Sequence, residues 1–478
     1  MSLRTPRLTA QIAAALLASA SLSACVPKLD PAPVPKPPSA YATEQTFAAP
    51  AGEWPSDRWW TAYGDPQLTA LIDEALADAP NLRVAESRVR AAVAQSETQR
   101  AVGLPQVTGD ASSQESRSSL NEGFPPQFFS FLPHSFKAQS RVTVDLDWQL
   151  DFFGRNRAAL AAATSQAEAA RADRAAARLQ LSTAVAAAYA DLVRLYADRD
   201  TAVQSVGIRR QSLSLVGQRL RNGLETQGQF SQQNATVPAS QQEVEAIDAQ
   251  IVLTRHQLAA LLGKGPDRGL AIARPSNPNL RAFGLPAHLA ADLIGRRPDI
   301  VAARLRAQAA ASQVKAARAD FYPNVDLTGA FGVQSLGINY LFQANSISGA
   351  LGPAIRLPLF SGGRIEGAYR GARAQYDEAV ANYDQTLTQA LRDVADAIAS
   401  QRSVQAQLAQ ARASLTASED AYRVARLRYT GGLSPYLDVL TAENTLLAER
   451  RTVSDLASQS LALDVSLIRA LGGGYVAG

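Results

Sequence analysis

The chain has 478 residues, of which 46% are hydrophobic, and its 47 basic and 43 acidic side chains give a formal net charge of +4. Because the two signs are mixed and nearly balanced, the composition lacks the basic patch that nucleic-acid binding requires. One Cys and three widely separated His exclude a disulfide framework and the usual metal-ligand motifs, so we nominate no metal ligand and no catalytic residue.

Residues 1–24 have the organisation of a bacterial signal peptide. Arg4 and Arg7 precede an apolar stretch from Leu8 to Leu22, which comes too early and is too short for a membrane-spanning helix. Removal of this segment takes away two positive charges, so the formal charge of the mature chain falls from +4 to +2.

The signal peptide ends in Leu22-Ser23-Ala24-Cys25, which is similar to a lipobox, where the Cys is acylated and becomes the first mature residue. A lone Cys is more often a buried structural residue. Its place after small residues at the end of a signal sequence favours lipidation instead. We therefore expect a diacylglycerol and an N-acyl lipid on Cys25, no other cofactor, and delivery to the outer membrane, since Val26 is not an inner-membrane retention signal.

A proline-rich segment follows the predicted lipid site. Six prolines lie within residues 27–38, a composition typical of extended chain that buries little surface. We predict that residues 25–53 form a lipid-anchored tether. No later window is apolar for the length that a membrane helix needs.

The rest of the chain contains an internal repeat. Pro80-Asn81-Leu82 resembles Pro298-Asp299-Ile300, 218 residues later, and Gly154-Arg155 matches Gly363-Arg364, 209 residues later. Further matches keep these two offsets, which chance matches would not do. We predict a first repeat over residues 54–263, a connection over 264–291, a second repeat over 292–472 and a C-terminal tail over 473–478.

Each repeat has the pattern helix, two strands, helix, helix. The first helices are predicted over Pro66 to Val102 and Pro298 to Asp320, both rich in Ala and Arg and both ending before a Pro. Alternating apolar and polar residues predict strands over 142–150 and 324–331, with weaker alternation over 351–360.

The alternation has two interpretations. A soluble antiparallel sheet with one wet face is the commoner one. Strands of about 9 to 11 residues in an outer-membrane lipoprotein favour the wall of a transmembrane barrel around a watery lumen. Four strands cannot close such a barrel, so several chains must contribute, and three chains would supply twelve strands.

A long helix follows each strand pair. Residues 156–221 and 364–429 contain no Pro and are rich in Ala, and at 1.5 Å per residue each would reach about 100 Å. Glycine-containing turns at Asn222-Gly223 and Gly431-Gly432 end these helices. Return helices then run to Leu262 and Leu471, so each repeat is predicted to contribute a long antiparallel hairpin.

An ordered set of motifs is similar to the outer-membrane factor family of TolC, OprM and NodT, in its lipid-anchored branch. The set covers about Trp54 to Gly472, and its members are Trp59-Trp60, Tyr63-Gly64-Asp65-Pro66, Trp148-Gln149-Leu150-Asp151-Phe152-Phe153-Gly154-Arg155, Gly295-Arg296-Arg297-Pro298-Asp299, Phe321-Tyr322-Pro323, Phe360-Ser361-Gly362-Gly363-Arg364 and Arg428-Tyr429-Thr430-Gly431-Gly432-Leu433. Gln149, where an acidic residue is common, and Pro238, inside the first return helix, depart from the family pattern.

The resemblance implies a mainly α fold with a membrane β-barrel portion. It implies a homotrimer with a twelve-stranded barrel in the outer-membrane lipids and a periplasmic α-helical barrel. It also implies passive export of small molecules, with a periplasmic adaptor protein and an inner-membrane pump of the resistance-nodulation-division (RND) type as partners.

The candidate functional residues lie at the two ends of this architecture. Asp438 matches a family position at the periplasmic constriction, where three carboxylates would attract cations; the alternative is an ordinary Asp in the first turn of a helix. The other candidates are Arg428 and Tyr429 for gating, Asn222, Gly223, Leu224, Gly431, Gly432 and Leu433 for adaptor contact at the tips, and Phe124, Phe128, Phe129 and Phe131 at the extracellular mouth, where they would plug the barrel or pack against lipid headgroups.

Two other functions share part of this pattern. A duct for type I protein secretion would have the same fold, although the lipobox disfavours it. A purely structural trimeric stalk would conduct nothing. An enzyme is not expected, because the sequence offers no catalytic centre.

Overall fold

A computed structural model describes residues 26–47, 51–117, 119, 125, 127, 135–276, 285–286, 293 and 295–477. The predicted signal peptide, Cys25 and the four candidate Phe residues of the extracellular mouth lie outside the described residues. The chain divides into two compact units. The sheet unit holds the described parts of Met1–Val34, Val89–Ala169 and Arg304–Asn382, and the hairpin unit holds those of Pro35–Arg88, Ala170–Ala303 and Tyr383–Gly478.

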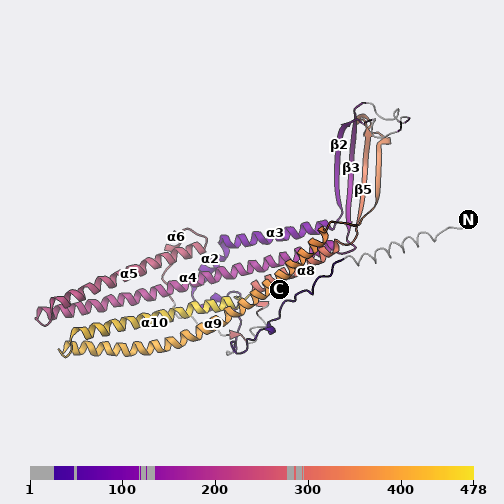
Figure 1. The fold of residues 1–478 in the computed structure, drawn as a ribbon. Coiled ribbons are helices and arrows are strands. Elements are labelled where there is room, and N and C mark those ends of the chain that lie inside the picture. Colours follow the sequence, from indigo (N-terminus) through magenta and orange to yellow (C-terminus); the bar gives the residue numbers. More distant parts are fainter. Residues whose placement is uncertain are drawn as a thin grey trace. The chain divides into compact units, whose positions relative to one another are not determined.

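Helices dominate the chain (Figure 1). The two longest have 67 residues each and the two return helices have 35 each, as the predicted hairpins require. Each element of the second hairpin begins and ends 209 residues after its counterpart. In chain order the helices are α2 (Pro66–Asp78), α3 (Pro80–Val102), α4 (Arg155–Arg221), α5 (Gln227–Leu261), the short α6 (Asp267–Leu270), α8 (Pro298–Ala319), α9 (Arg364–Thr430) and α10 (Tyr436–Ala470).

The prediction of one continuous helix from Pro66 to Val102 is wrong. Helix α2 ends at Asp78, and Ala79 takes an extended conformation with φ −60° and ψ 129° before α3 begins at Pro80. A residue before proline is pushed out of the helical region by the proline ring, which explains the break. Pro238 has no such effect, because α5 continues through it.

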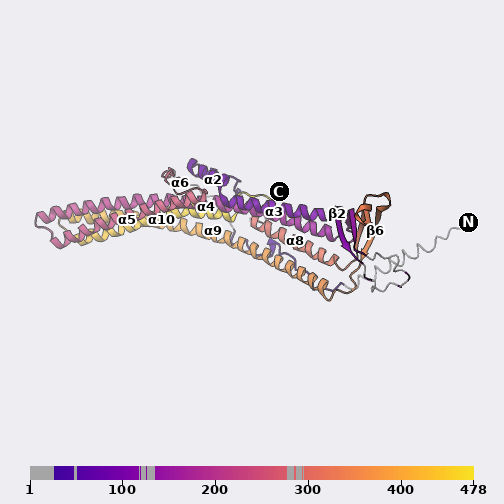
Figure 2. The same cartoon turned by 90° about the horizontal axis from the view of Figure 1, so that it is seen from above.

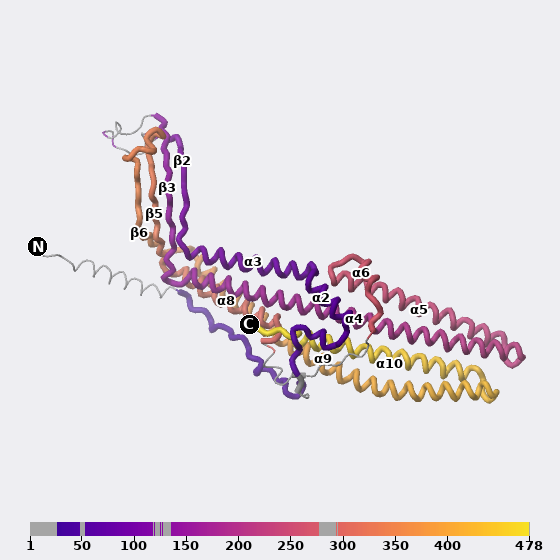
Figure 3. The backbone as a smooth tube through the Cα atoms, turned by 180° about the vertical axis from the view of Figure 1, so that it is seen from behind, coloured from indigo at the N-terminus to yellow at the C-terminus, as the bar shows by residue number. Residues whose placement is uncertain are grey.

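Four antiparallel strands form the sheet in the order β2 (Gln106–Ser116), β3 (Lys137–Leu150), β5 (Asn324–Leu336) and β6 (Ile347–Arg356) (Figure 3). The strands predicted over 142–150 and 324–331 are confirmed within β3 and β5. The prediction over 351–360 is wrong by four residues at each end. Gly349 and Gly352 obscure the alternation there, and Pro353 is tolerated because β6 is an edge strand.

The register separates the side chains of this sheet into two faces. Val107, Leu146, Gly329 and Leu351 lie in one row across the four strands. The apolar face to which they belong is open in the single chain, with Leu351 72% exposed. On the opposite face, Thr143 is buried and donates to Asp145 at 2.9 Å. The apolar face is therefore uncovered in the single chain, whereas a soluble sheet packs such a face against a core.

The hairpin unit contains the core of the described chain. Trp59, Trp60 and Tyr63 are buried against α2, α4, α5 and α10. The buried Asp65 caps α2 by accepting hydrogen bonds from the backbone N–H groups of Gln67 and Leu68, at 2.8 and 3.0 Å. None of the described helices combines the length and hydropathy needed to cross a membrane.

The segment predicted as a tether is extended but makes specific contacts. In the sheet unit, Arg373 donates to the Pro31 carbonyl at 2.7 Å and Tyr376 donates to that of Pro33 at 3.0 Å. In the hairpin unit, Tyr41 and Phe47 pack against the core that α8, α9 and α10 share. No residue between 31 and 47 is buried, so the segment buries little surface, as expected, although it makes these specific contacts.

Candidate functional site: the hairpin tips and the strand-to-helix junction

Each hairpin turns through the same local structure. Helix α4 ends in a Schellman motif, in which Leu224 N–H donates to the Arg219 carbonyl at 2.8 Å and Gly223 takes a φ of 75°. Helix α9 ends identically, with Leu433 N–H donating to the Arg428 carbonyl at 2.8 Å and Gly432 at a φ of 72°. The two hairpins lie side by side in Figures 1 and 2.

Tyr429 joins the two tips. Its side chain is fully buried, and its hydroxyl donates to Glu225 Oε1 at 2.7 Å. The Arg219 guanidinium lies 4.4 Å from the centre of the Tyr429 ring and donates to the Tyr429 carbonyl at 2.9 Å. The contact between the two tips is thus stabilised by a cation–π interaction, a hydrogen bond and the nearby Arg219–Glu225 ion pair. We call Arg219, Glu225 and Tyr429 the tip clasp.

A second layer of contacts lies beneath the tip clasp. Tyr436 packs edge-on against Tyr429 at 5.5 Å and donates a hydrogen bond to Gln233. Glu443 on α10 is completely buried and accepts from Ser212 Oγ of α4 at 2.5 Å. Arg209 of α4 lies 3.5 Å from the other carboxylate oxygen of Glu443. The two hairpins of one chain are therefore joined by polar contacts in a nearly dry interior.

Burial raises the pKa of Glu443, and the Ser212 hydrogen bond and the Arg209 charge only partly oppose this rise. A carboxyl whose folded-state pKa is raised favours folding below its unfolded pKa, and this stability is lost as pH rises through the folded value. We expect Glu443→Gln, which is neutral at every pH, to remove this part of the pH dependence.

The measurement is hydrogen exchange of the α10 backbone amides near Glu443 at about pH 5 and pH 7.5, corrected for intrinsic rates. Wild-type protection should fall at the higher pH, while Glu443→Gln should keep it constant. Glu449→Gln, a change at a half-buried position on the same helix, serves as the control and should retain the wild-type pH response. An unchanged response in Glu443→Gln would contradict the prediction.

The structure separates the sequence-predicted tip residues into two groups. Tyr429 is buried in the tip clasp, whereas Arg428 and Asp438 are exposed, with Asp438 in the first turn of α10. The predicted adaptor-contact residues all lie at the surface; Leu224 is 61% and Leu433 74% exposed, and the others are Asn222, Gly223, Gly431 and Gly432.

Sequence reasoning missed Arg219, Glu225 and Glu443. Arg219 stands 209 residues before Arg428, so the repeat offset singles it out as the counterpart of a predicted residue. Glu225 and Glu443 correspond to Ser434 and Asn234, so no similarity between the repeats marks them. Their burial arises only when the two hairpins pack together.

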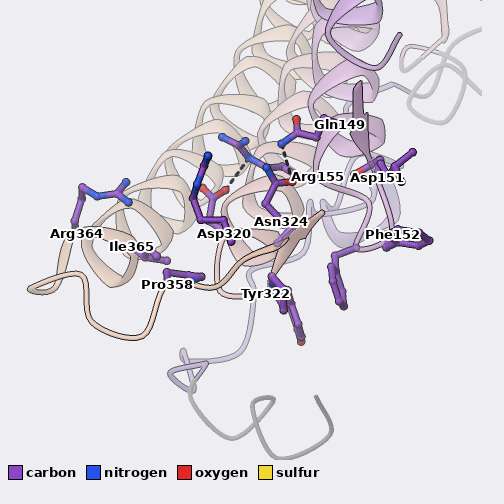
Figure 4. Close-up of a pocket in the computed structure, with 15 residues that line it drawn as sticks. Gln149, Asp151, Phe152, Arg155, Asp320, Tyr322, Asn324, Pro358, Arg364 and Ile365 are labelled. Atoms are coloured by element: carbon purple, nitrogen blue, oxygen red, sulfur yellow. Dashed lines mark hydrogen bonds and ion pairs between the residues drawn. The ribbon is translucent and has the colours of Figure 1, made fainter. Parts of the chain in front are cut away.

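The strand-to-helix junction lies within the sheet unit, where the strands end and α4 and α9 begin (Figure 4). A pocket of about 300 Å³ lies there, lined by the predicted motif residues around Gln149, Tyr322 and Arg364. Arg155 Nε lies 2.7 Å from Asp320 Oδ1. This ion pair ties the start of α4 to the residue that follows α8.

Gln149, the departure from the family pattern, uses both ends of its amide. Its nitrogen donates to Asn324 Oδ1 at 2.8 Å, and its oxygen accepts from the Asn156 side chain at 2.8 Å. A carboxylate has no donor for the first of these bonds. Nearby, burial acts to raise the pKa of Asp151, but hydrogen bonds from the N–H groups of Arg157 and Asn156 hold that pKa below its usual value.

The described tips and junction are held together by hydrogen bonds, ion pairs and aromatic packing. Their chemistry holds helices together and presents apolar side chains at the surface. Such an arrangement suits a conduit or a docking structure.

Comparison with known proteins gives the same assignment. The sequence profile described as "Outer membrane efflux protein" matches residues 71–264 and 289–473. The chain is 31% identical to the multidrug resistance outer membrane protein MdtP of Escherichia coli K12, over 93% of this chain and 91% of that protein. It is 38% identical to the fusaric acid resistance protein FusA of Burkholderia cepacia, over 67% of this chain and 60% of FusA.

A solved structure shares the fold. The outer membrane protein VceC of Vibrio cholerae superposes with a TM-score of 0.83 at 41% sequence identity, covering 88% of this chain and all of that one. The family match covers most of the chain, in the two stretches 71–264 and 289–473. The chain therefore belongs to the outer membrane efflux protein family and is an efflux channel of the outer membrane.

Proposed function

We propose that this chain acts as an internally duplicated homotrimer whose twelve strands form a barrel in the outer membrane and whose hairpins form a periplasmic helical barrel. The observation that carries the proposal is the four-stranded sheet. Its apolar face is exposed in the single chain, and its polar side chains, such as Thr143 and Asp145, are hydrogen-bonded on the opposite face. The sheet has two free edges, β2 and β6, which copies of the chain would pair to close the wall. Cys25 would carry the lipid.

We propose further that the duct passes small organic molecules delivered by an RND-type pump through a periplasmic adaptor. The names of MdtP and FusA, which refer to multidrug and fusaric acid resistance, support this cargo class. Leu224 and Leu433 would contact the adaptor. Three copies of Asp438 would form a carboxylate ring that attracts cations at the periplasmic opening.

Deletion of the gene followed by a susceptibility panel tests this function. We expect the deletion strain to become at least fourfold more sensitive to several unrelated small molecules, and the wild-type gene to restore resistance. A panel without any change, combined with loss of a protein from the culture medium, would overturn the small-molecule duct in favour of protein secretion. The Leu224→Asp and Leu433→Asp variants test the adaptor contact, since both should assemble normally yet fail to restore resistance.

A further inference from the structure

A second pocket, of about 650 Å³, lies within the hairpin unit and has no role in the function proposed above. Helices α4, α9 and α10 and the start of α8 line it, with residues such as Leu179, Ala397, Arg469 and Asp299. We call it the Arg469 pocket. Sites for drug-sized organic molecules typically have volumes in this range, so the pocket is large enough to hold one.

The carboxylates that line the Arg469 pocket already have arginine partners. Arg297 is only 8% exposed; its Nη2 lies 2.7 Å from Asp299 Oδ2 and its Nη1 lies 3.3 Å from Asp393 Oδ2. Arg392 Nε lies 3.7 Å from Asp396 Oδ2, one turn further along α9. A cationic ligand would have to compete with these arginines for each carboxylate.

Arg469 is different from the other charged groups of this pocket. It lies in the last turn of α10 with an exposed side chain, and no carboxylate of the described residues forms an ion pair with it. A guanidinium is charged at every relevant pH and can donate two parallel hydrogen bonds to one carboxylate. The charge that the pocket leaves without a partner is therefore positive, which favours a ligand with an anionic group.

Apolar side chains line the same cavity as Arg469. They are Ala176 and Leu179 of α4, Ala397 of α9 and Leu463 of α10. Leu179 and Leu463 are half-buried, so part of each side chain remains available to a ligand. Covering these side chains would supply affinity for an apolar body, while Arg469 would fix the position of a charged end.

We propose that the Arg469 pocket binds an organic monoanion, a carboxylate carried on an apolar body, and that such acids are among the molecules that the channel passes. The binding stands by itself, and only its link to cargo rests on the proposed function. A small inorganic anion would contact Arg469 but leave Leu179 and Leu463 uncovered. An organic cation would cover these leucines but meet the unpaired guanidinium.

Three dansyl probes with the same fluorescent body test the ligand class on the full chain purified in neutral detergent. The anion is 6-(dansylamino)hexanoate, the cation is dansylcadaverine and the neutral probe is N-hexyl dansylamide. With the signal of empty micelles subtracted, we expect the anion to bind at least about tenfold more tightly than the other two. Excess acetate or inorganic phosphate should displace little of it. Equal binding of anion and cation overturns the ligand class, and full displacement by acetate overturns the apolar contribution.

Matched variants locate the binding site. Arg469→Gln should weaken the anion at least about tenfold, because it removes a charge-assisted hydrogen bond, while unchanged binding of the neutral probe would show that the pocket still forms. Arg469→Lys keeps the charge and should have an intermediate affinity. Ser466→Phe narrows the pocket without a change of charge and should weaken all three probes. Arg412→Gln, at an exposed position on α9 outside the lining, is the control and should bind as wild type. Wild-type binding of the anion by Arg469→Gln overturns the site.

Resistance of cells tests the link to cargo separately. The Arg469→Gln gene should give at least fourfold less resistance to organic acids than the wild-type gene, with resistance to cationic compounds changed less than twofold. If the probes bind as expected but resistance to acids is unchanged, the cargo part of the proposal is overturned and the binding site stands. If the wild-type gene gives no resistance to any compound, the proposed function fails instead, and the probe measurements still decide whether the pocket binds organic anions.

Discussion

Tyr429→Ala is expected to separate the two hairpin tips within each chain and to make the closed channel leak. The change removes a fully buried ring, leaves Glu225 without its hydroxyl donor and takes the aromatic face away from Arg219. Loss of a large buried aromatic side chain costs about 3–5 kcal/mol, and an ion pair left in a partly dry site adds to the cost. Conductance without applied adaptor, and sensitivity of cells to large polar antibiotics, should both rise.

Two further variants make this prediction specific. Tyr429→Phe keeps the ring and its contact with Arg219 but loses the bond to Glu225, so its leak should be intermediate. Thr430→Ala changes the next residue, which is exposed and bonds only within its own helix, and should behave as wild type. A leak of equal size in Thr430→Ala, or none in Tyr429→Ala, would show that the tip clasp does not hold the channel closed.

Gly332→Ala is expected to prevent stable assembly of the sheet. A Cβ at this position of β5 would lie 2.1 Å from the Val142 carbonyl oxygen and 2.6 Å from Thr143 Cα on β3. Both atoms belong to the backbone of a central strand, so the strands must move apart. We expect a cost of about 3 kcal/mol or more, at the upper end of what overpacking produces. The measurement is the fraction of chain in the outer membrane that resists urea extraction.

Gly352→Ala is the matched control for this experiment. Gly352 lies on the same face of the sheet, on edge strand β6, and a Cβ there would meet no atom within 4 Å. Any general effect of exchanging glycine for alanine in a strand should be seen in both variants. Normal assembly of Gly332→Ala, or equal loss in both variants, would contradict the close-approach explanation.

Periodicity predicted most of the fold because it is a local property. The Pro-free stretches gave α4 and α9 almost to the residue, and the alternation around Val144 gave β3. The rule for residues before proline predicts a break at Ala79. The helical pattern on both sides of Ala79 favoured one continuous helix instead. The extent of β6 depended on pairing with β5, which no local pattern records.

The candidate site was predictable only in part. The glycine turns identified where the tips lie, and the repeat offset made Arg219 findable. The tip clasp itself depends on which faces of two helical hairpins meet. A tyrosine such as Tyr429 has an apolar ring and a polar hydroxyl, so its sequence position alone does not tell whether it is exposed or buried. Glu443 illustrates the same limit, since a carboxylate in an amphipathic helix is ordinarily read as solvent-exposed.

The docked N-terminal segment has a consequence for the lipid. The predicted tether of residues 25–53 would leave the anchored end free to range over many tens of ångströms. With the Pro31 carbonyl held by Arg373 of α9, only six residue steps separate Cys25 from Pro31. Six extended residues span at most about 21 Å. The acyl chains proposed for Cys25 would therefore enter the bilayer within that radius of the first turns of α9, which would limit the depth at which the chain can sit in the membrane.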